Sequence, residues 1–354
     1  MSAIEIVTIL LTCFTISWLS VPFVKKMAVQ IKAVDYPDTK RKFHKGVIPR
    51  LGGLSIFLAF LIGYVLFGSN FEGLDHVLVG AFIIILIGMY DDITPIKPMV
   101  KFGGQFLAAL VVLYSGQFII SEFVLIPGLT IEFPTWFAPI FTLLWIVGIT
   151  NAVNLIDGLD GLASGISAIT LTTLAFLAVF DGSNFAATVT LILLGATLGF
   201  MVFNFPPASI FMGDTGSNFL GFMIAVLSIL GYKQAAFASF LMPIVMLGVP
   251  ILDTFIAIIR RRLRGQSIGE PDREHLHHKL LDSTASSTKT LLIIYAISAL
   301  FSATAVVYGI RKTWGLTLLA ILLICVEIFI EKYELIGPKY KPVLSLVAFL
   351  KRKK

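Results

Sequence analysis

Charged residues are scarce in this chain. Only 14% of its 354 residues are Asp, Glu, Lys or Arg, against about 25% in an average soluble domain, while 57% are hydrophobic. A soluble globule of this length has too little interior to hide that much apolar surface. The low charge and the 30 Phe exclude disorder. The chain has two cysteines, both inside apolar runs, so a disulfide-stabilised scaffold is excluded as well.

Long apolar runs fill most of the sequence. About eleven of them approach the roughly 20 residues that a membrane-spanning helix needs. The runs lie near residues 3–24, 51–68, 76–90, 99–115, 136–152, 162–180, 186–204, 216–232, 237–259, 290–310 and 313–331. We therefore expect an all-α polytopic membrane protein, with a single integral membrane domain over residues 1–354. The first run has no small-residue cleavage site, so we expect it to remain as a span.

Lys and Arg predict the orientation in the bilayer, because cytoplasmic loops carry an excess of them. With the N-terminus outside, 24 of the 27 Lys and Arg fall on the cytoplasmic side, and only Lys233, Arg311 and Lys312 remain outside. The C-terminus is then cytoplasmic, where its basic end suits an anionic inner leaflet. The net charge of +6 is explained in this way without a nucleic acid.

Two segments between the spans have a distinct character. Residues 117–134 contain two β-prone runs around Pro127-Gly128, which predicts a small external β-hairpin. Residues 260–289 form the longest cytoplasmic loop and are rich in Arg and His. The sequence shows no internal repeat that would suggest the two halves of a transporter.

Acidic residues near the spans gather on one predicted side. An acid is costly in lipid, so each one near a span is a candidate functional residue. Six of them fall at or near the cytoplasmic face in this topology: Asp91, Asp92, Asp157, Asp160, Asp214 and Asp253. Because the orientation rests on Lys and Arg alone, the acids indicate independently that one polar site lies at the inner membrane surface.

Several of these acids also have a structural interpretation. Asp91 and Asp92 fit the end of a helix, although a carboxylate has the wrong sign for a helix C-terminus. Asp214 fits a helix N-cap, but its glycine neighbours also fit a backbone that approaches a phosphate or metal. Asp253 fits a structural hydrogen bond as well as it fits a direct role.

The third group of acids has a regular spacing. Asn154, Asp157 and Asp160 are three residues apart, which places them on one face of a helical turn. The alternative is a simple turn supported by Gly158 and Gly161. Glycines here also allow a ligand to approach the backbone closely.

Carboxylates without neighbouring cysteines favour a hard cation. Mg²⁺ takes one or two carboxylates, keeps waters and accepts phosphate oxygens. Acids that face the cytosol therefore indicate Mg²⁺ together with a nucleotide or diphosphate. The sequence contains neither a Walker A motif nor G-x-G-x-x-G, so a P-loop ATPase or a Rossmann protein lacks its key residues.

Basic residues and histidines supply candidate anion ligands. The candidate phosphate- and sugar-binding residues are Arg260, Arg261, Arg262, His275, His277, His278 and Lys45. Arginine binds phosphate in bidentate fashion, and histidine can donate to phosphate near neutral pH. The arginines and Lys45 are explained equally by the excess of positive charge inside. The H-x-H-H spacing is not a usual zinc pattern.

Four motifs in this order resemble one enzyme family over nearly the whole chain. They are Asp91-Asp92, Asn154 with Asp157-Gly158-Leu159-Asp160-Gly161, Asn204 with FMGDTGS around Asp214, and His275-Leu276-His277-His278. In these the chain resembles the polyprenyl-phosphate N-acetylhexosamine-1-phosphate transferases, which include the bacterial enzymes that start wall teichoic acid and O-antigen synthesis. The H-x-H-H pattern resembles that of the family members that transfer N-acetylglucosamine 1-phosphate, which we call the N-acetylglucosamine branch. One departure is Pro95, where related sequences often have Lys or Asp.

The resemblance implies the substrates and the cofactor. It implies Mg²⁺, with Mn²⁺ as a substitute, a cytosolic UDP-N-acetylglucosamine donor and an undecaprenyl phosphate acceptor in the bacterial plasma membrane. By analogy, Asp91, Asp92 and Asp214 are catalytic, and Asp214 and Asp92 hold the metal. The implied nucleotide-binding residues are Asn154, Asp157, Gly158, Asp160 and Asn204. The histidine segment would hold the diphosphate and sugar, and a homodimer is expected from analogy alone.

The expected reaction transfers N-acetylglucosamine 1-phosphate to the lipid and releases UMP, as the first membrane step of a cell-envelope polysaccharide or wall teichoic acid pathway. A direct attack and a covalent phospho-Asp intermediate both fit the sequence. A phospho-MurNAc-pentapeptide transferase of the same family is the alternative. A polyprenyl-lipid transporter is a second one, but it would place its charges near mid-membrane.

Overall fold

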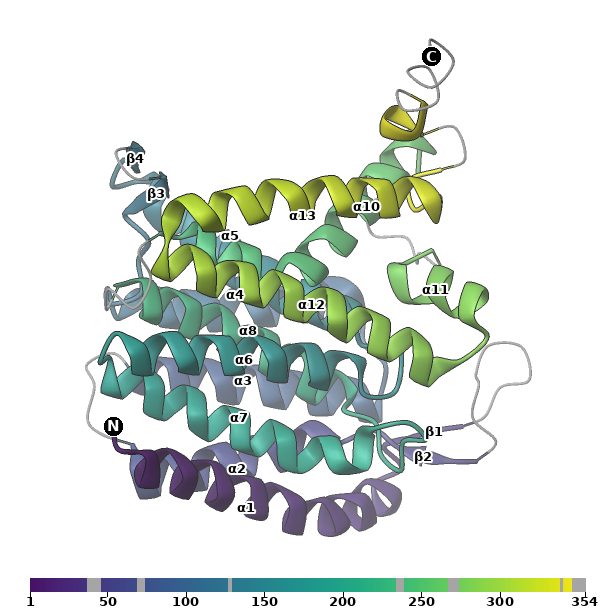
Figure 1. Cartoon of the computed structure of the whole chain (residues 1–354). Helices are drawn as coiled ribbons and strands as arrows, with labels where there is room; N and C mark the ends of the chain where they lie inside the picture. Colours follow the sequence, from purple (N-terminus) through teal and green to yellow (C-terminus); the bar gives the residue numbers. More distant parts are fainter. Residues whose placement is uncertain are drawn as a thin grey trace. The chain divides into compact units, whose positions relative to one another are not determined.

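The computed structural model describes residues 1–36, 46–68, 74–126, 129–233, 239–266, 274–337 and 340–345. The described chain is mainly helical and divides into two compact units, Met1–Leu241 and Met242–Lys354, which are treated separately (Figure 1). The helices of the first unit are α1 (Ala3–Gln30), α2 (Gly52–Phe67), α3 (Leu74–Ile93), α4 (Pro98–Tyr114), α5 (Phe137–Leu155), α6 (Leu162–Phe180), α7 (Asn184–Asn204) and α8 (Gly213–Lys233). Helix α9 (Leu241–Met246) starts at the boundary, and α10 (Gly248–Leu263), α11 (Leu276–Thr284), α12 (Ser287–Ile310) and α13 (Lys312–Lys332) follow.

The helical polytopic class predicted from the sequence is confirmed. Within the described ranges, eight helices are long and apolar enough to cross a membrane, and α2 and α4 are shorter apolar helices. Ten of the eleven predicted runs coincide with one helix each. The run near 237–259 is instead divided between α9 and α10, because Pro250 has no N–H to offer the carbonyl of Met246 and its ring crowds that turn. The total of eleven spans and the orientation stay predictions.

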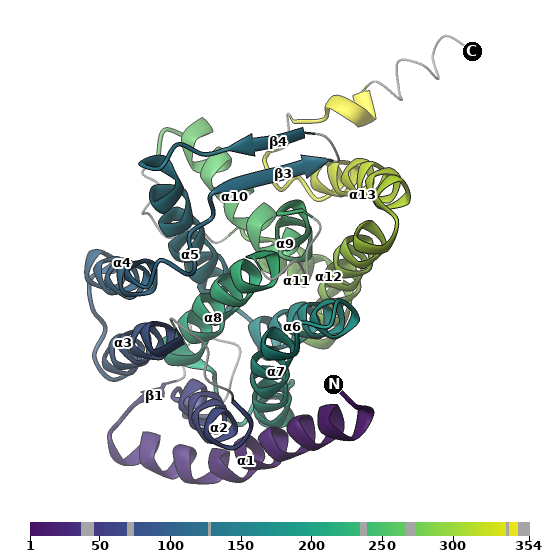
Figure 2. The ribbon, with the colours of Figure 1, turned by 90° about the vertical axis from the view of Figure 1, so that its left-hand side faces the viewer.

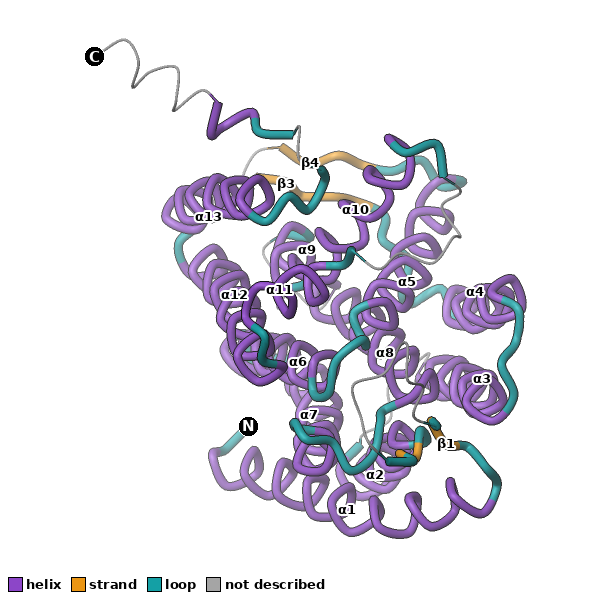
Figure 3. Tube along the Cα trace, turned by 90° about the vertical axis from the view of Figure 1, so that its right-hand side faces the viewer, coloured by secondary structure: helices purple, strands orange, loops and turns teal. Residues whose placement is uncertain are grey.

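The helices of the first unit alternate in direction, so its connections collect at two ends (Figure 1). One end carries the N-terminus and the strands β3 (Glu122–Ile126) and β4 (Leu129–Glu132); we call it the hairpin end, and Figure 2 faces it. At the other end α3, α5 and α7 finish and α4, α6 and α8 begin; we call it the acidic end, and Figure 3 faces it.

Helix α8 forms the centre of the first unit. It packs against α2, α3, α5 and α6 (Figure 2). Of its most apolar 18-residue stretch, 94% is buried. Small residues allow this packing. A Cβ added at Gly53 of α2 would lie 2.1 Å from the Cα of Gly216, and one added at Gly88 of α3 would lie 2.6 Å from the Cα of Thr215. Two helices therefore touch the backbone of the first turn of α8.

A small sheet and backbone hydrogen bonds tie the start of α2 to the segment that precedes α8. Strands β1 (Val34–Asp35) and β2 (Ile48–Pro49) pair antiparallel. The N–H of Phe211 donates to the carbonyl of Pro49 over 2.8 Å, and the N–H of Gly52 donates to Phe211 over 2.9 Å. The segment that leads into α8 is thus bonded to the backbone of β2 and to the first residue of α2.

At the hairpin end, β3 and β4 pair antiparallel. Both lie within residues 117–134, where the sequence predicts two strands. Phe123 of β3 lies against Phe141 of α5 and against Phe240, with ring centroids 6.4 and 5.7 Å apart. The strands are thereby attached to the helical bundle. Their position outside the membrane stays a prediction.

The second unit has a paired α12 and α13 joined at Arg311. Only 11% of the most apolar 18-residue stretch of α13 is buried within the protein, as expected for a helix that faces lipid. Glu331, near the end of α13, is one of its few buried residues, and its carboxylate accepts hydrogen bonds from the N–H groups of Val343 and Leu344 over 2.6 and 2.7 Å. The segment 260–289, predicted as a loop, contains α11 as well as the end of α10.

The packing around α8 predicts a large effect of one methyl group. Gly53→Ala should lower the free energy of unfolding by about 1–3 kcal/mol or more, because the new Cβ would overlap backbone atoms that cannot move away as a side chain could. The thermal unfolding temperature of the detergent-solubilised protein should fall accordingly. Gly148→Ala in α5 is the matched control, since no atom lies within 4 Å of its Cβ position. Equal unfolding temperatures for both variants would contradict this packing.

Candidate functional site

The carboxylates of Asp91, Asp92 and Asp214 come together at the acidic end. The first two lie in the last turn of α3, and Asp214 lies in the first turn of α8, which packs against α3. The sequence predicted this convergence although the residues are more than 120 positions apart. The structure gives each of the three a different set of partners.

Asp92 bonds to the N-terminus of α8. Its Oδ1 accepts a hydrogen bond from the N–H of Asp214 over 2.9 Å, and its Oδ2 accepts from the N–H and the hydroxyl of Thr215 over 3.0 and 2.6 Å. The side chain of Asp92 is fully buried, and Arg50 stands 3.7 Å from Oδ1. A carboxylate is the favoured group at a helix N-terminus, so Asp92 caps α8 from a neighbouring helix.

Asp91 and Asp214 share the ammonium group of Lys101. The Nζ of Lys101 lies 2.8 Å from Oδ2 of Asp91 and donates a short hydrogen bond to Oδ2 of Asp214. The other oxygen of Asp91 accepts from the N–H of Ile96 over 2.8 Å. A single cation therefore sits between two carboxylates from different helices.

Lys101 is a residue that the sequence motifs did not assign to the site. The signal was present, because α3 and α4 are joined by only four residues and Pro98 begins α4. A residue in the first turn of α4 returns to the level of the last turn of α3. Lys101 is the one cation in that turn, and it supplies the positive charge that Pro95 cannot.

A polar pocket of about 380 Å³ lies beside this cluster. All five residues that the resemblance assigned to the nucleotide line it, together with Asp214, Asp35 and Arg50. The five are Asn154, Asp157, Gly158, Asp160 and Asn204. They come from the end of α5, from the loop between α5 and α6 and from the end of α7, so the structure brings them to one place. Their contact with a nucleotide stays a prediction.

Asn204 and Asp160 join the two loops that border the pocket. Asn204 accepts hydrogen bonds from the N–H of Gly161 and the hydroxyl of Ser164 over 3.1 and 2.8 Å, and it donates to the carbonyl of Ile210 over 3.1 Å. Asp160 accepts from the N–H of Ala208 over 2.9 Å. These two side chains give the pocket its shape, whatever else they bind.

A chain of amides supports Asp214 from inside the bundle. Asn154 donates to the hydroxyl of Ser217 over 2.8 Å and to Oδ1 of Asp214 over 3.4 Å. Asn218 donates to the carbonyl of Asp214 over 2.8 Å and accepts from Gln105 over 2.9 Å. A buried polar network of this kind holds its members in one arrangement. Gln105 and Asn218 were not predicted, because single amides within apolar helices carry no motif.

Asp157 is held in its neutral form near pH 7. Burial raises the pKa of its carboxyl, the negative charges of Asp214 and Asp92 raise it further, and the pKa reaches about 8. The site therefore contains both ionised and protonated carboxyl groups at the pH of the cytosol. Asp157 can donate a hydrogen bond where its neighbours can only accept one.

The remaining predicted residues, apart from Lys45, belong to the second unit. Arg260 is 2% exposed and donates to the carbonyl of Leu335 over 2.5 Å, whereas Arg262 is exposed. Arg260 thus has a structural contact, and its binding of phosphate stays a prediction, as does that of Arg261. Lys45 lies outside the described residues.

The histidine segment is packed tightly at the start of α11. The rings of His275 and His277 are nearly parallel, with centroids 6.1 Å apart, and those of His277 and His278 are 4.1 Å apart. Burial, followed by the charge of His278, lowers the pKa of His277 to about 3. His277 is therefore neutral at physiological pH and can contact a phosphate only through an uncharged ring.

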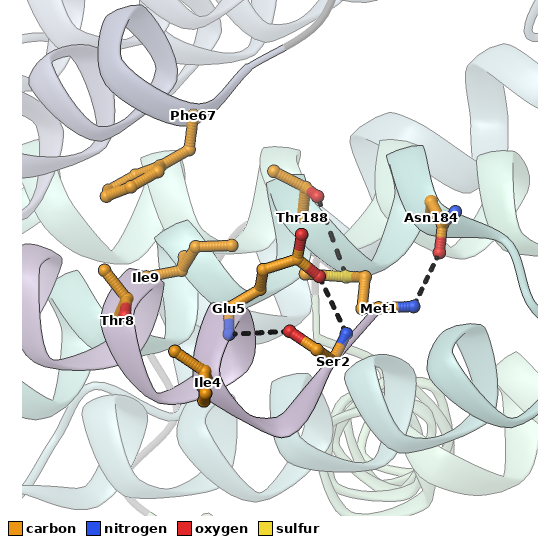
Figure 4. A pocket seen from close by; sticks show the side chains of 9 residues that line it. All are labelled: Met1, Ser2, Ile4, Glu5, Thr8, Ile9, Phe67, Asn184 and Thr188. Atoms are coloured by element: carbon orange, nitrogen blue, oxygen red, sulfur yellow. Dashed lines mark hydrogen bonds between the residues drawn. The ribbon is translucent and has the colours of Figure 1, made fainter.

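A second pocket, of about 510 Å³, opens at the start of α1 (Figure 4). Glu5 is the one acid among its lining residues, and its carboxylate accepts from the N–H of Ser2 over 2.7 Å. The hydroxyl of Ser2 accepts in return from the N–H of Glu5 over 3.2 Å, and the terminal ammonium of Met1 donates to Asn184 over 3.1 Å (Figure 4). This pattern is a capping box, and it explains the acid without catalysis.

Buried carboxylates that share one cation beside a polar pocket are typical of a membrane enzyme that handles phosphorylated substrates. Residues 75–232 match the family model for glycosyl transferase family 4. A probable undecaprenyl-phosphate N-acetylglucosaminyl 1-phosphate transferase of Bacillus subtilis (strain 168) is 43% identical over 341 residues, or 94% of each chain. A decaprenyl-phosphate N-acetylglucosaminephosphotransferase of Mycobacterium tuberculosis (strain ATCC 25618 / H37Rv) is 33% identical over 96% of this chain and 92% of the relative.

The chain belongs to glycosyl transferase family 4, and the family resemblance seen in its motifs is confirmed. It is a phosphoglycosyl transferase of the membrane. A phospho-N-acetylmuramoyl-pentapeptide-transferase of Lacticaseibacillus paracasei is also similar, at 32% identity, but over only 54% of this chain and 63% of the relative. The two N-acetylglucosamine relatives named above thus match over a much greater length than this pentapeptide transferase.

The high pKa of Asp157 predicts how stability depends on pH. The unfolded carboxyl loses its proton near pH 4, while the folded one keeps it to about pH 8, so ionisation costs stability progressively between these values. Asp157→Asn should therefore raise the unfolding temperature relative to the unmodified protein more at pH 8.5 than at pH 5. Glu122→Gln on β3 serves as the control substitution, and a difference for Asp157→Asn that does not grow with pH would contradict the assignment.

Proposed function

We propose that this protein transfers N-acetylglucosamine 1-phosphate from UDP-N-acetylglucosamine to undecaprenyl phosphate and releases UMP, in the plasma membrane of a bacterium. The observation that carries the proposal is the pair Asp91–Asp214 on one cation, next to a pocket lined by every residue of the predicted nucleotide motif. The Bacillus subtilis relative is named for undecaprenyl phosphate and N-acetylglucosamine, and the Mycobacterium tuberculosis relative is named for decaprenyl phosphate and the same sugar. The reaction begins a cell-envelope polymer, such as wall teichoic acid or a lipopolysaccharide O-antigen.

The proposal places the acidic end at the cytosol, where UDP-sugars are found. Supporting this, 24 of the 27 Lys and Arg lie in segments that the sequence predicts to be cytoplasmic. The pocket offers carboxyl and amide groups to the base and ribose, and Arg50 offers a cation at the same pocket. Neutral Asp157 adds a donor among acceptors, which suits a carbonyl oxygen of a uracil ring.

The residues of the cluster fit a magnesium ion. Oxygens of Asp91 and Asp214 already converge on one cation, and hard oxygen ligands are those that Mg²⁺ prefers. Within the described ranges no group of three or more His, Cys, Asp or Glu is arranged to hold a metal. A magnesium ion here would take two carboxylates and complete its shell with water and phosphate oxygens. Because both oxygens of Asp92 accept hydrogen bonds from α8, we assign the second carboxylate to Asp91. When bound, the ion supplies a Lewis acid for the leaving phosphate.

The reaction needs positioning more than covalent chemistry from the protein. The second pKa of the acceptor phosphate is about 6, so this phosphate is largely dianionic at pH 7. A general base therefore adds little to its attack on the sugar-linked phosphorus. Lys101 reduces the repulsion between the two anionic reactants. The bonds of Asp92 to α8 disfavour a phospho-Asp92 intermediate, because its formation would remove the cap. Asp91 remains the carboxylate available for a covalent route.

Purified protein tests the proposal directly. In detergent with undecaprenyl phosphate, Mg²⁺ and labelled UDP-N-acetylglucosamine, UMP and labelled lipid should appear in equal amounts, and chelation should stop both until Mg²⁺ or Mn²⁺ is restored. Asp214→Asn should reduce turnover by about 100-fold or more, since it removes a charge next to the reacting phosphates.

The control for Asp214→Asn is Asp75→Asn, an exposed acid in the first turn of α3 at the hairpin end, which should leave turnover unchanged. Near-normal turnover of Asp214→Asn would show that the acidic end is not the active site. Lipid transport in proteoliposomes without UMP release would replace the transferase with a transporter.

A further inference from the structure

Asp253 holds the start of the histidine segment with both of its oxygens. Its Oδ2 lies 2.9 Å from Nδ1 of His275, and its Oδ1 accepts a hydrogen bond from the N–H of Leu276 over 2.8 Å. Asp253 lies in α10, whereas Leu276 begins α11. One carboxylate thus joins α10 to a segment more than 20 residues further along the chain.

The surroundings of Asp253 make this contact strong. The side chains of Asp253 and His275 are 5% and 6% exposed, and Asp253 borders a small apolar cavity lined by residues such as Ile256, Leu276 and Phe329. A carboxylate buried among apolar side chains is unfavourable unless it is hydrogen-bonded. Removing one partner would leave a buried charge without compensation, which is costly.

The contact determines which nitrogen of His275 carries the proton. A carboxylate accepts at Nδ1, so the proton of a neutral ring lies on Nδ1 and the lone pair lies on Nε2. The same carboxylate fixes the first N–H of α11, the helix that continues through His277 and His278. Ring orientation and backbone position are therefore set by a single side chain.

One nitrogen of the histidine segment lacks a partner within the described part of the chain. The Nε2 of His277, a residue only 3% exposed, has no hydrogen-bond partner among the residues that the structure describes. A buried nitrogen without a partner is unfavourable and points to a group that is bound during function. A contact that only joined α10 to α11 would require neither three histidines nor a buried ring nitrogen without a partner.

We propose that Asp253 is a positioning residue for the transfer reaction: it fixes the tautomer and orientation of His275 and the start of α11, so that the histidine segment meets the phosphate or sugar oxygens of the donor in one geometry. This inference rests on the proposed function for its substrate. It assigns no contact between Asp253 and the substrate.

The isosteric change Asp253→Asn separates positioning from folding. The amide oxygen still accepts from Leu276, but the amide nitrogen now donates to Nδ1 of His275, which moves the ring proton to Nε2. The unfolding temperature should change little, while kcat/KM for UDP-N-acetylglucosamine should fall by about 10- to 100-fold, as for partners that orient functional histidines. Asp282→Asn, at an exposed acid of α11, is the control and should leave both quantities unchanged.

A double-mutant cycle tests whether Asp253 acts through His275. In a His275→Ala background, Asp253→Asn should cause no further loss of kcat/KM, because the ring that it orients is absent. Additive losses, or a loss that matches a fall in unfolding temperature, would overturn the proposal in favour of a structural role.

The tautomer can be read without any substrate. ¹⁵N chemical shifts of histidine-labelled protein, with His275 assigned from His275→Gln, should show the proton on Nδ1 in the unmodified protein and on Nε2 in Asp253→Asn. If the unmodified protein released no UMP, the proposed reaction would fail while this measurement still decided the effect of Asp253. An unchanged tautomer in Asp253→Asn would overturn the inference itself.

Discussion

Asp92 holds the first turn of α8 through three hydrogen bonds from Asp214 and Thr215. The arrangement of the acidic end depends on this contact. It fixes the backbone that carries Asp214, it fixes the end of α3 that carries Asp91, and it therefore sets the distance between the two carboxylates that share Lys101. The glycines of α2 and α3 allow both helices to come close enough for the contact to form.

The charges at the acidic end compensate one another across helices. Two carboxylates at the C-terminus of α3 are unfavourable within that helix, because its own dipole has the same sign there. The positive end of the α8 dipole lies against Asp92, and the ammonium of Lys101 lies against Asp91. Each acid thus has a compensating group from another element, which is how a mostly apolar protein keeps three carboxylates together.

Much of the first unit follows from the order of apolar runs and acids. Runs of about 20 apolar residues predict helices that reverse direction at each loop, and the acids at every second loop must then meet at one end. The break before α10 was not predicted, because a proline within a long apolar run is compatible with a single kinked helix. Lys101 and the amide chain through Gln105 were missed as well, since their importance depends on which face of α4 meets α8. Burial of Arg260 in the second unit depends likewise on packing that a run of three arginines does not reveal.

The central claim is that Asp92 organises the site by capping α8. Hydrogen exchange over residues 211–219 in the detergent-solubilised protein, measured for Asp92→Ala and Asp92→Asn, tests it most directly. The account predicts faster exchange of the Asp214 and Thr215 amides in Asp92→Ala and an intermediate rate in Asp92→Asn, which keeps one acceptor. Unchanged exchange in both variants, with activity nevertheless lost, would contradict the account and assign Asp92 to direct contact with the substrate or metal.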